Sequence, residues 1–292
     1  MWLLVGGDSE IGATTYRYLK TRNIPAAATT RRRENVDSNR PFLNFGDSIA
    51  DWRPPNGTDA ACIFAAIARL NICAADPIGS ANINVTQTLS LIERLLADNI
   101  YVLFLSTNQV FDGTKPMMKV NAALSPVSEY GQQKAKVESQ LHRYVNRGAP
   151  ISVLRLTKVL SPRMPLLRGW IEKLSANAPI AAFHDMMLAP VPTSLVVQTI
   201  NSLMASRITG IFQLSGERDV SYADVGRHLA ERLSVDPALV VETSAADNGQ
   251  PAGATPRFTS LDSTILCKRL GLKVPEVWDA IATASASPSG KI

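Results

Sequence analysis

Short apolar runs alternate along the chain with longer segments in which apolar residues recur at helical spacing. The runs expected to be strands are residues 2–5, 26–30, 60–65, 101–106 and 151–156, and the helical segments between them are 11–20, 83–97 and 128–145. The strand runs are predominantly apolar instead of alternating with polar residues, as is typical of strands buried on both faces. The pattern therefore predicts an α/β protein whose core is a doubly wound parallel sheet of the Rossmann type.

The regular alternation ends after residue 160, where prolines interrupt short helical pieces. We expect a main domain over residues 1–160, to which 193–215 returns, and a smaller, discontinuous domain over 161–192 and 216–284. Within the latter, residues 221–233 are expected to form a helix with Ser221 as its N-cap. Residues 285–292 are small, polar and aperiodic, and we expect a tail there.

The composition narrows the function classes only slightly. The 292 residues are 46% hydrophobic and 19% charged, as in ordinary globular proteins. The net charge of +5 is scattered apart from residues 31–33, so a nucleic-acid partner is not expected. With no leader-like or membrane-spanning stretch, the chain is expected in the cytoplasm, without a membrane partner. The three cysteines have no metal-site spacing, and we expect no metal.

A glycine-rich segment follows the first expected strand at once, where a dinucleotide-binding fold places its phosphate loop. It comprises Gly6, Gly7, Asp8, Ser9, Glu10, Ile11 and Gly12. In this interpretation Gly6 permits the tight turn, small Ser9 the close approach of a pyrophosphate, and Gly12 the packing of helix on sheet. A plain strand-to-helix turn is the alternative.

The second expected strand ends in three arginines, Arg31, Arg32 and Arg33. A site for NAD normally has an acidic residue here, which holds the ribose 2′-hydroxyl, whereas a guanidinium matches the oxygens of a 2′-phosphate. NADP is therefore favoured over NAD. The alternative is a solvated basic loop.

Tyr130 and Lys134 are four residues apart in an expected helix and so share one face. Lowering a tyrosine pKa from about 10 to about 7 takes roughly 4 kcal/mol, and a cation ~4 Å away supplies about that much at an effective dielectric of about 20. Tyr16 and Lys20 have the same spacing on the first helix, so the spacing alone proves little. The second pair differs because Thr107 ends a strand upstream, at the sheet edge where ligands of such folds bind.

These motifs, together with the run from Ser106 to Gly113, resemble the extended short-chain dehydrogenase/reductase family, in its dTDP-4-dehydrorhamnose reductase branch, over nearly the whole chain. The resemblance implies a catalytic triad of Thr107, Tyr130 and Lys134, in which Lys134 also holds the nicotinamide ribose. It further implies cofactor contacts from other loops, which are Asn44 and Phe45 at the adenine, and Ala65, Ala66 and Asn84 along the cofactor.

The chain departs from the branch at positions that bear on the substrate. Asn108 and Gln109 stand in the usual Ser-Thr-Asp-Tyr run, and Lys158 stands where a tryptophan often follows the strand. Two aromatic contacts to a sugar are thereby missing. We expect Gln109, Lys158 and Arg163 at the substrate, where the basic residues would contact a phosphate or carboxylate, with exposed surface charge as the alternative.

The function predicted from these features is NADPH-dependent reduction of a keto group on a sugar nucleotide or a related small carbonyl compound, with Tyr130 as general acid. A nucleotide-sugar epimerase or dehydratase with the same triad is one alternative. A non-catalytic, NADP-binding regulatory subunit is another. The resemblance also makes a homodimer plausible, with the smaller domain binding the substrate.

Overall fold

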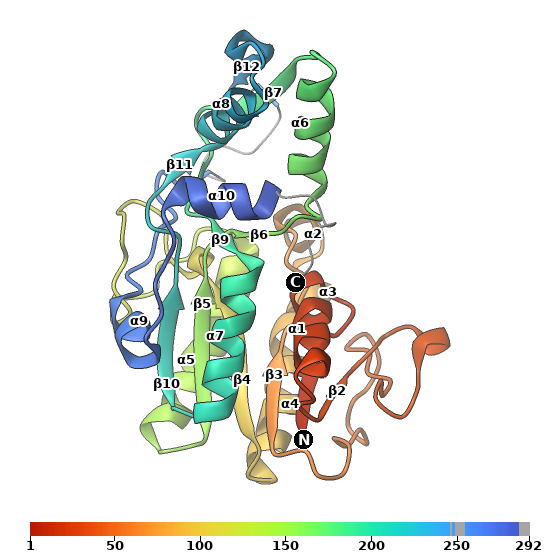
Figure 1. Ribbon diagram of the computed structural model, residues 1–292. Helices are drawn as coiled ribbons and strands as arrows, with labels where there is room; N and C mark the ends of the chain where they lie inside the picture. The colour runs from red at the N-terminus through yellow and green to blue at the C-terminus, as the bar shows by residue number, and fades with distance from the viewer. Residues whose placement is uncertain (246, 249–254, 286–292) are drawn as a thin grey trace. The chain divides into compact units, whose positions relative to one another are not determined.

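A six-stranded sheet forms the centre of the first of two units into which the chain divides (Figure 1). β1 pairs in parallel with β2 and β3, and β3 pairs in parallel with β4. The strands, in their order across the sheet, are β10 (Gly210–Leu214), β5 (Ile151–Leu156), β4 (Tyr101–Thr107), β3 (Ala60–Ile63), β1 (Trp2–Val5) and β2 (Ala26–Ala28). The predicted fold class is confirmed.

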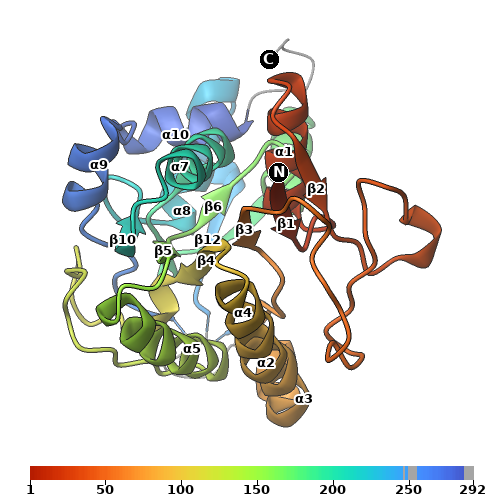
Figure 2. The ribbon, with the colours of Figure 1, turned by 90° about the horizontal axis from the view of Figure 1, so that it is seen from below.

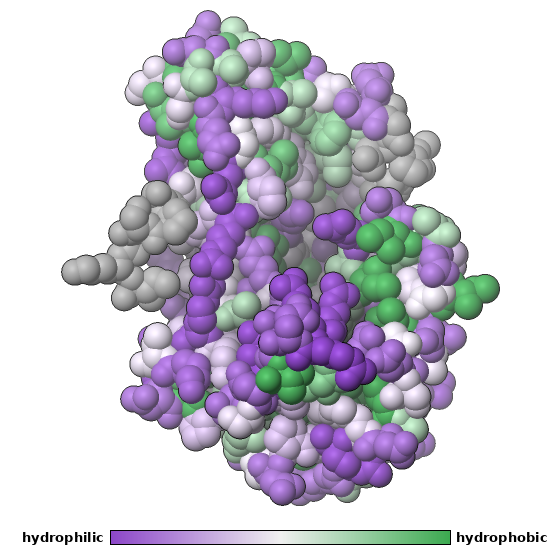
Figure 3. Space-filling view, turned by 90° about the vertical axis from the view of Figure 1, so that its right-hand side faces the viewer, coloured by the Kyte–Doolittle hydropathy of each residue, from purple (hydrophilic) through white to green (hydrophobic). Residues whose placement is uncertain are grey.

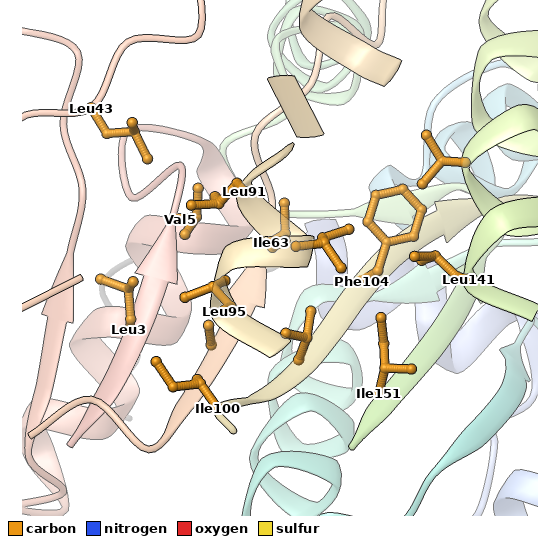
Figure 4. Packing of buried hydrophobic residues seen from close by; sticks show 14 of the residues in the cluster. Leu3, Val5, Leu43, Ile63, Leu91, Leu95, Ile100, Phe104, Leu141 and Ile151 are labelled. Carbon is orange, nitrogen blue, oxygen red and sulfur yellow. The ribbon is translucent and has the colours of Figure 1, made fainter. Parts of the chain in front are cut away.

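Helices cover both faces of this sheet. α4 (Thr88–Ala97) and α5 (Glu129–Asn146) lie on one face, and α1 (Glu10–Thr21) and α7 (Thr193–Ser206) lie on the other (Figure 2). Leu95 and Leu141 from the first pair of helices pack with Phe104 of β4 in a cluster that excludes water (Figure 4). Burial on both faces explains why the strand sequences are mostly apolar and do not alternate with polar residues.

The computed structural model describes residues 1–245, 247–248 and 255–285. The first unit comprises Met1–Val110, Leu124–Arg155 and Val196–Gln213, and the second comprises the described residues of Phe111–Ala123, Leu156–Leu195 and Leu214–Ile292. Residues 111–123, which were expected in the main domain over 1–160, belong to the second unit.

The chain between β3 and α4 is more finely divided than its sequence pattern indicates. It forms α2 (Leu70–Ala75), α3 (Pro77–Ala81) and a π-helical segment, η2 (Asn82–Gln87), before α4 begins. The hydrophobic period had suggested one helix over residues 83–97. π-helical segments are rare, and those that occur often lie at functional sites. The residues of η2 are therefore candidates for a functional role.

The second unit has its own apolar core, built around Trp170, Leu174 and Leu229. Ser221 caps α8 (Tyr222–Leu233) as predicted, and its hydroxyl accepts from the Asp224 amide while the Asp224 carboxylate accepts from the Ser221 amide. The described helices and strands of the second unit are β6 (Val159–Leu160), α6 (Pro165–Ser175), β7 (Ile180–Phe183), β8 (Met187–Leu188), β9 (Val191–Pro192), β11 (Val220–Ser221), α8 (Tyr222–Leu233), η4 (Pro237–Leu239), β12 (Val240–Thr243), α9 (Thr264–Leu270) and α10 (Val277–Ser285).

Two further predictions concerned a tail at the C-terminal end and the absence of a membrane-spanning stretch. The tail predicted for 285–292 lies outside the described residues, apart from Ser285, which ends α10. Among the helices that the structure describes, none has both the length and the apolar character that crossing a bilayer would need.

Candidate functional site

The glycine loop after β1 turns sharply into α1. Gly6 has φ of +94°, and a Cβ added there would lie 2.7 Å from the Ala65 nitrogen. A Cβ on Gly12 would lie 2.5 Å from the Gly6 carbonyl oxygen. Only glycine fits at these two positions, so the loop brings the N-terminus of α1 close to the ends of β1 and β3.

Ser9 was expected only to allow the close approach of a pyrophosphate because it is small, but its hydroxyl also makes two hydrogen bonds within the loop. Its hydroxyl accepts from the Gly12 amide at 3.1 Å and donates to the Gly6 carbonyl at 2.8 Å, which makes it the N-cap of α1. Glu10 follows as the exposed first residue of the helix, and Ile11 is partly exposed. The first turn of α1 therefore presents its amide end to the loop, as an anion site requires.

The carboxylate of Asp8 points from the loop to the end of β2. Its oxygens accept from the Thr30 hydroxyl at 3.0 and 2.9 Å and from the Arg31 amide at 3.0 Å. Arg40 forms an ion pair with it, 2.7 Å from Nη2 to Oδ1. Asp8 was predicted at the cofactor from the glycine loop, whereas Arg40 was not predicted, because no sequence motif identifies a residue that far beyond β2.

The three arginines after β2 are all exposed and differ in their contacts. The guanidinium of Arg33 stacks over the Phe42 ring, 4.4 Å from its centroid. Within the described residues, the side chains of Arg31 and Arg32 have no hydrogen bond or ion pair. The loop that carries them projects at the right of Figure 1, and hydrophilic residues gather at the centre of the face that Figure 3 shows from that side. Two guanidiniums are thus free to bind a ligand.

Asn44 and Phe45 were expected at the adenine, and their contact with a nucleotide stays a prediction. Phe45 is buried in the core cluster of the first unit. The Asn44 amide group accepts from the Gly46 nitrogen at 3.1 Å and donates to Asp47 at 3.2 Å. Contact of Phe45 with a nucleotide would therefore use its main chain, not its ring.

Ala65 and Ala66 follow β3 directly, and both are partly exposed. The Ala65 amide donates to the Val5 carbonyl at 3.1 Å, which keeps this segment beside the end of β1. Since a Cβ at Gly6 would meet Ala65, the two segments form adjoining walls at the carboxyl edge of the sheet. Their predicted contact with a cofactor stays a prediction.

Asn84, in the π-helical segment, was predicted to border the cofactor, but its amide is used within the protein. It is buried, accepts from the Ile67 nitrogen at 2.8 Å and donates to the Ile67 carbonyl at 2.9 Å. It also donates to Gln133 Oε1 at 2.7 Å, and Gln133 in turn donates to Ser80 at 2.8 Å and to Glu129 at 2.9 Å. Asn84 thus positions the segment after β3 against α5.

At the end of β4, a turn brings α5 close to the sheet. The Gln109 amide donates to the Thr107 hydroxyl at 3.2 Å, and the Ser128 hydroxyl donates to Gln109 Oε1 at 3.2 Å. A Cβ on Gly131 would lie 2.1 Å from the Gln109 carbonyl oxygen. Gly131 therefore lets the first turn of α5 pack against η3 (Asn108–Val110), and Tyr130 is held beside the end of β4.

Lys134 lies one turn further along α5, and its charge faces several partners. It is 4% exposed, its Nζ donates to the Leu105 carbonyl at 2.9 Å, and the same atom lies 4.3 Å from the Phe104 ring centroid and 5.9 Å from that of Tyr130. Burial lowers the pKa of Lys134 to about 8, and the Glu138 carboxylate opposes that change.

The pKa of Tyr130 differs from the expectation. Burial raises it well above its ordinary value, and the Cys73 thiol adds to the increase. The expected lowering by Lys134 is therefore wrong for the protein without ligands. The physical reason is that desolvation of the phenolate outweighs an ammonium that is itself dehydrated and bonded to a carbonyl.

Ser106 was not proposed as a site residue, although it precedes Thr107. It is 6% exposed, and its Oγ has no hydrogen-bond partner among the described residues. A buried hydroxyl without a partner is uncommon and indicates that something is still to be bound beside it. The signal in the sequence was the pair of hydroxyl residues at the strand end.

The remaining predicted substrate residues, Lys158 and Arg163, belong to the second unit. Both side chains are exposed. Their main chains are fixed, because the Lys158 carbonyl accepts from the Val191 amide at 2.9 Å and the Arg163 amide donates to Ser161 Oγ at 3.1 Å. Their role at a substrate stays a prediction.

Known proteins share this architecture along nearly the whole chain. UDP-glucose 4-epimerase from Thermotoga maritima, solved with UDP-glucose, matches with a TM-score of 0.80 at 19% identity over 97% of each chain. A dTDP-glucose 4,6-dehydratase from Streptomyces venezuelae, solved as a double mutant with NAD and DAU bound, matches with a TM-score of 0.77 at 20% identity over 98% of this chain and 95% of that one.

Two curated relatives extend the comparison to sequence. The probable low-salt glycan biosynthesis reductase Agl14 of Haloferax volcanii is 27% identical over 230 residues, 76% of this chain and 75% of its own. The methionine adenosyltransferase 2 subunit beta of Xenopus tropicalis is 23% identical over 282 residues, 87% of this chain and 77% of its own.

The parallel sheet and the glycine loop after β1, with the structural matches above, define an extended short-chain dehydrogenase/reductase fold. Within that class, the chain belongs to the family described as RmlD substrate binding domain, whose model matches residues 1–287. Binding of NAD(P) is typical of this family.

Proposed function

We propose that the protein is an NADPH-dependent reductase of a keto group on a nucleotide sugar. The observation that carries the proposal is the arrangement around Lys134, whose Nζ bonds to the end of β4 and faces the Tyr130 ring. This pair lies on the helix that Gly131 brings against the turn after Thr107. A phenol, an ammonium and a hydroxyl at one sheet edge are suited to proton delivery to a carbonyl oxygen.

The residues after β1 and β2 fit NADP. Gly6 and Gly12 place no side chain at the two tightest points of the loop where α1 begins. Arg31 and Arg32, whose guanidiniums have no partner among the described residues, are available for the 2′-phosphate. NADPH, when bound, supplies the hydride. NAD is the alternative cofactor, and direct binding measurements distinguish the two.

Each of the three predicted catalytic residues has a separate task. Tyr130 donates the proton, since a phenol whose pKa is at or above its ordinary value is protonated at neutral pH. Lys134 provides a positive charge that stabilises the phenolate left behind, and it holds a ribose hydroxyl. The Thr107 hydroxyl polarises the substrate carbonyl, since its bond to Asn108 Oδ1, at 3.4 Å, is long enough to be exchanged for a substrate oxygen.

The nucleotide-sugar substrate is supported by family membership, by the similarity to a probable glycan biosynthesis reductase, and by the structural likeness to an epimerase solved with UDP-glucose. Gln109 replaces an aromatic residue of the rhamnose-reductase branch, and Lys158 replaces another. We therefore expect a substrate that depends less on stacking and more on polar contacts, with Gln109, Lys158 and Arg163 as candidates.

The test uses the full chain with NADPH and a panel of 4-keto nucleotide sugars. Tyr130→Phe should lower kcat by about 10²–10⁴-fold while the Kd for NADPH stays within about twofold, because only proton transfer is lost. Tyr16→Phe is the matched control, since Tyr16 has a lysine at the same spacing on α1, and it should leave turnover unchanged. Equal turnover by both variants would contradict the assignment of Tyr130.

A second candidate function is a cofactor-binding subunit of another enzyme. The similarity to the beta subunit of methionine adenosyltransferase 2 favours it. Tight NADPH binding without oxidation of NADPH by any keto sugar would support this function. Conversion of a nucleotide sugar without net oxidation of cofactor would instead support an epimerase or dehydratase.

A further inference from the structure

Arg40 is held beside the end of β2 by main-chain pairing. The Ala28 amide donates to the Asn39 carbonyl at 2.9 Å, and the Thr30 amide donates to the Pro41 carbonyl at 3.0 Å. Arg40 lies between these two acceptors, so its position is fixed at the place where dinucleotide-binding proteins distinguish a ribose 2′-hydroxyl from a 2′-phosphate.

The Arg40 guanidinium is only partly used. Its Nη2 donates to Asp8 at 2.7 Å, while its Nε is buried and has no partner among the described residues. A guanidinium has five N–H donors, so this one can hold Asp8 and still donate to a further acceptor. Its side chain is 30% exposed, which leaves it accessible to a ligand.

The acceptor sites of the Asp8 carboxylate, in contrast to the donors of Arg40, are largely occupied. Thr30, the Arg31 amide and Arg40 together direct donors at both of its oxygens. Since a carboxylate has about four lone-pair sites, little capacity is left for a ribose hydroxyl. Its negative charge would also repel a 2′-phosphate unless a cation stood between them.

Building on the NADP site proposed above, we propose that Arg40 is a specificity-determining residue that binds the 2′-phosphate of NADP, and that Asp8 positions Arg40 and does not itself bind the cofactor. Arg31 and Arg32 reach the phosphate from an exposed loop, whereas Arg40 is fixed by an ion pair and by the pairing along β2. This preorganisation reduces the conformational entropy lost on binding.

The test measures the Kd of NADPH and NADH for the full-length protein by isothermal titration calorimetry. Arg40→Gln should weaken NADPH binding about tenfold or more, as expected for loss of a charge-assisted hydrogen bond, and leave NADH binding within about twofold. Asp8→Asn keeps an acceptor for Arg40 and removes a negative charge, so it should tighten NADPH binding severalfold without improving NADH binding. Arg17→Gln, an exposed arginine on α1, is the matched control.

The outcomes separate this inference from the proposed function. If the unaltered protein binds neither nucleotide, the NADP site itself is wrong and this inference fails with it. If NADPH binds and Arg40→Gln does not change its preference over NADH, only the role of Arg40 is overturned. If both variants weaken both nucleotides equally, the ion pair is structural, and the inference is again overturned.

Discussion

The ammonium of Lys134 donates a hydrogen bond to the main-chain carbonyl of Leu105, with 2.9 Å between Nζ and the oxygen. The bond ties the first half of α5 to the end of β4, near Thr107. It also withdraws the ammonium from water, and Lys134 is consequently the side chain in the proposed triad whose protonation is most sensitive to pH near neutrality.

The first prediction concerns stability against pH. The pKa of Lys134 is about 8 in the folded protein, compared with an ordinary value of 10.5, so between these values the unfolded chain binds a proton that the folded protein does not. The free energy of unfolding should therefore rise with pH relative to Lys134→Met. We expect the difference between the two proteins to change by about 2 kcal/mol between about pH 7.5 and 9.5.

Urea unfolding of both proteins at the two pH values measures this change. Lys136→Met, on the exposed face of the same helix, controls for loss of a lysine from α5. A stability difference between the protein and Lys134→Met that does not vary with pH would contradict the lowered pKa.

The second prediction concerns the approach of α5 to the sheet. Gly131→Ala places a Cβ 2.1 Å from the Gln109 carbonyl, so the helix or the turn must move. We expect a loss of about 1–3 kcal/mol in unfolding free energy, together with reduced turnover because Tyr130 moves with the helix. Gly169→Ala is the control, since nothing lies within 4 Å of its Cβ in α6 and alanine favours a helix. Unchanged stability in Gly131→Ala would show that the contact is not limiting.

The third prediction concerns the polar network of Asn84. Asn84→Ala leaves the Ile67 main chain and the Gln133 side chain without their partner in a buried place. The expected cost is about 3 kcal/mol of unfolding free energy. A double-mutant cycle with Gln133→Ala should be non-additive by about 1 kcal/mol, since the two side chains share one bond. Additive losses would mean that each side chain acts independently.

The fourth prediction concerns a buried ion pair behind the site. Arg155 of β5 and Glu138 of α5 lie 2.7 Å apart and are 3% and 1% exposed in their side chains. Arg155→Met alone should cost about 3–5 kcal/mol, because it leaves a buried carboxylate unpaired, whereas Arg155→Met combined with Glu138→Leu should recover most of that loss. Guanidinium unfolding of the three proteins measures it. A double variant as unstable as the single one would refute this account.

The fold could be predicted because strands buried on both faces have mostly apolar sequences. Residues 101–106 and 151–156 are mostly apolar, with Arg155 as the one charged residue, and both became strands covered on two faces. Ser221 was recognised as an N-cap for a similarly local reason, since its partner Asp224 lies in the same turn. Local patterns and short spacings carry this information.

The site could be predicted only as far as motifs reach. The loop of Gly6 and the pair on α5 were visible, but the ring of Phe45 proved to be buried in the core, and the amide of Asn84 to be engaged by the main chain. Arg40 was missed because its place depends on how residues 39–43 return to β2. The pKa of Tyr130 was misjudged because desolvation depends on the packing around it, which no spacing reveals.

The order of the chain through its two units has a consequence for biosynthesis. Val196–Gln213, which carries most of α7 and of the edge strand β10, returns to the first unit only after the chain has passed through Leu156–Leu195 of the second. While a ribosome is still adding those residues, the sheet has no β10, and α7 is not yet there to cover its share of one face. We therefore expect nascent chains shorter than about 215 residues to need protection from aggregation, and the glycine loop to be translated long before the sheet around it is complete.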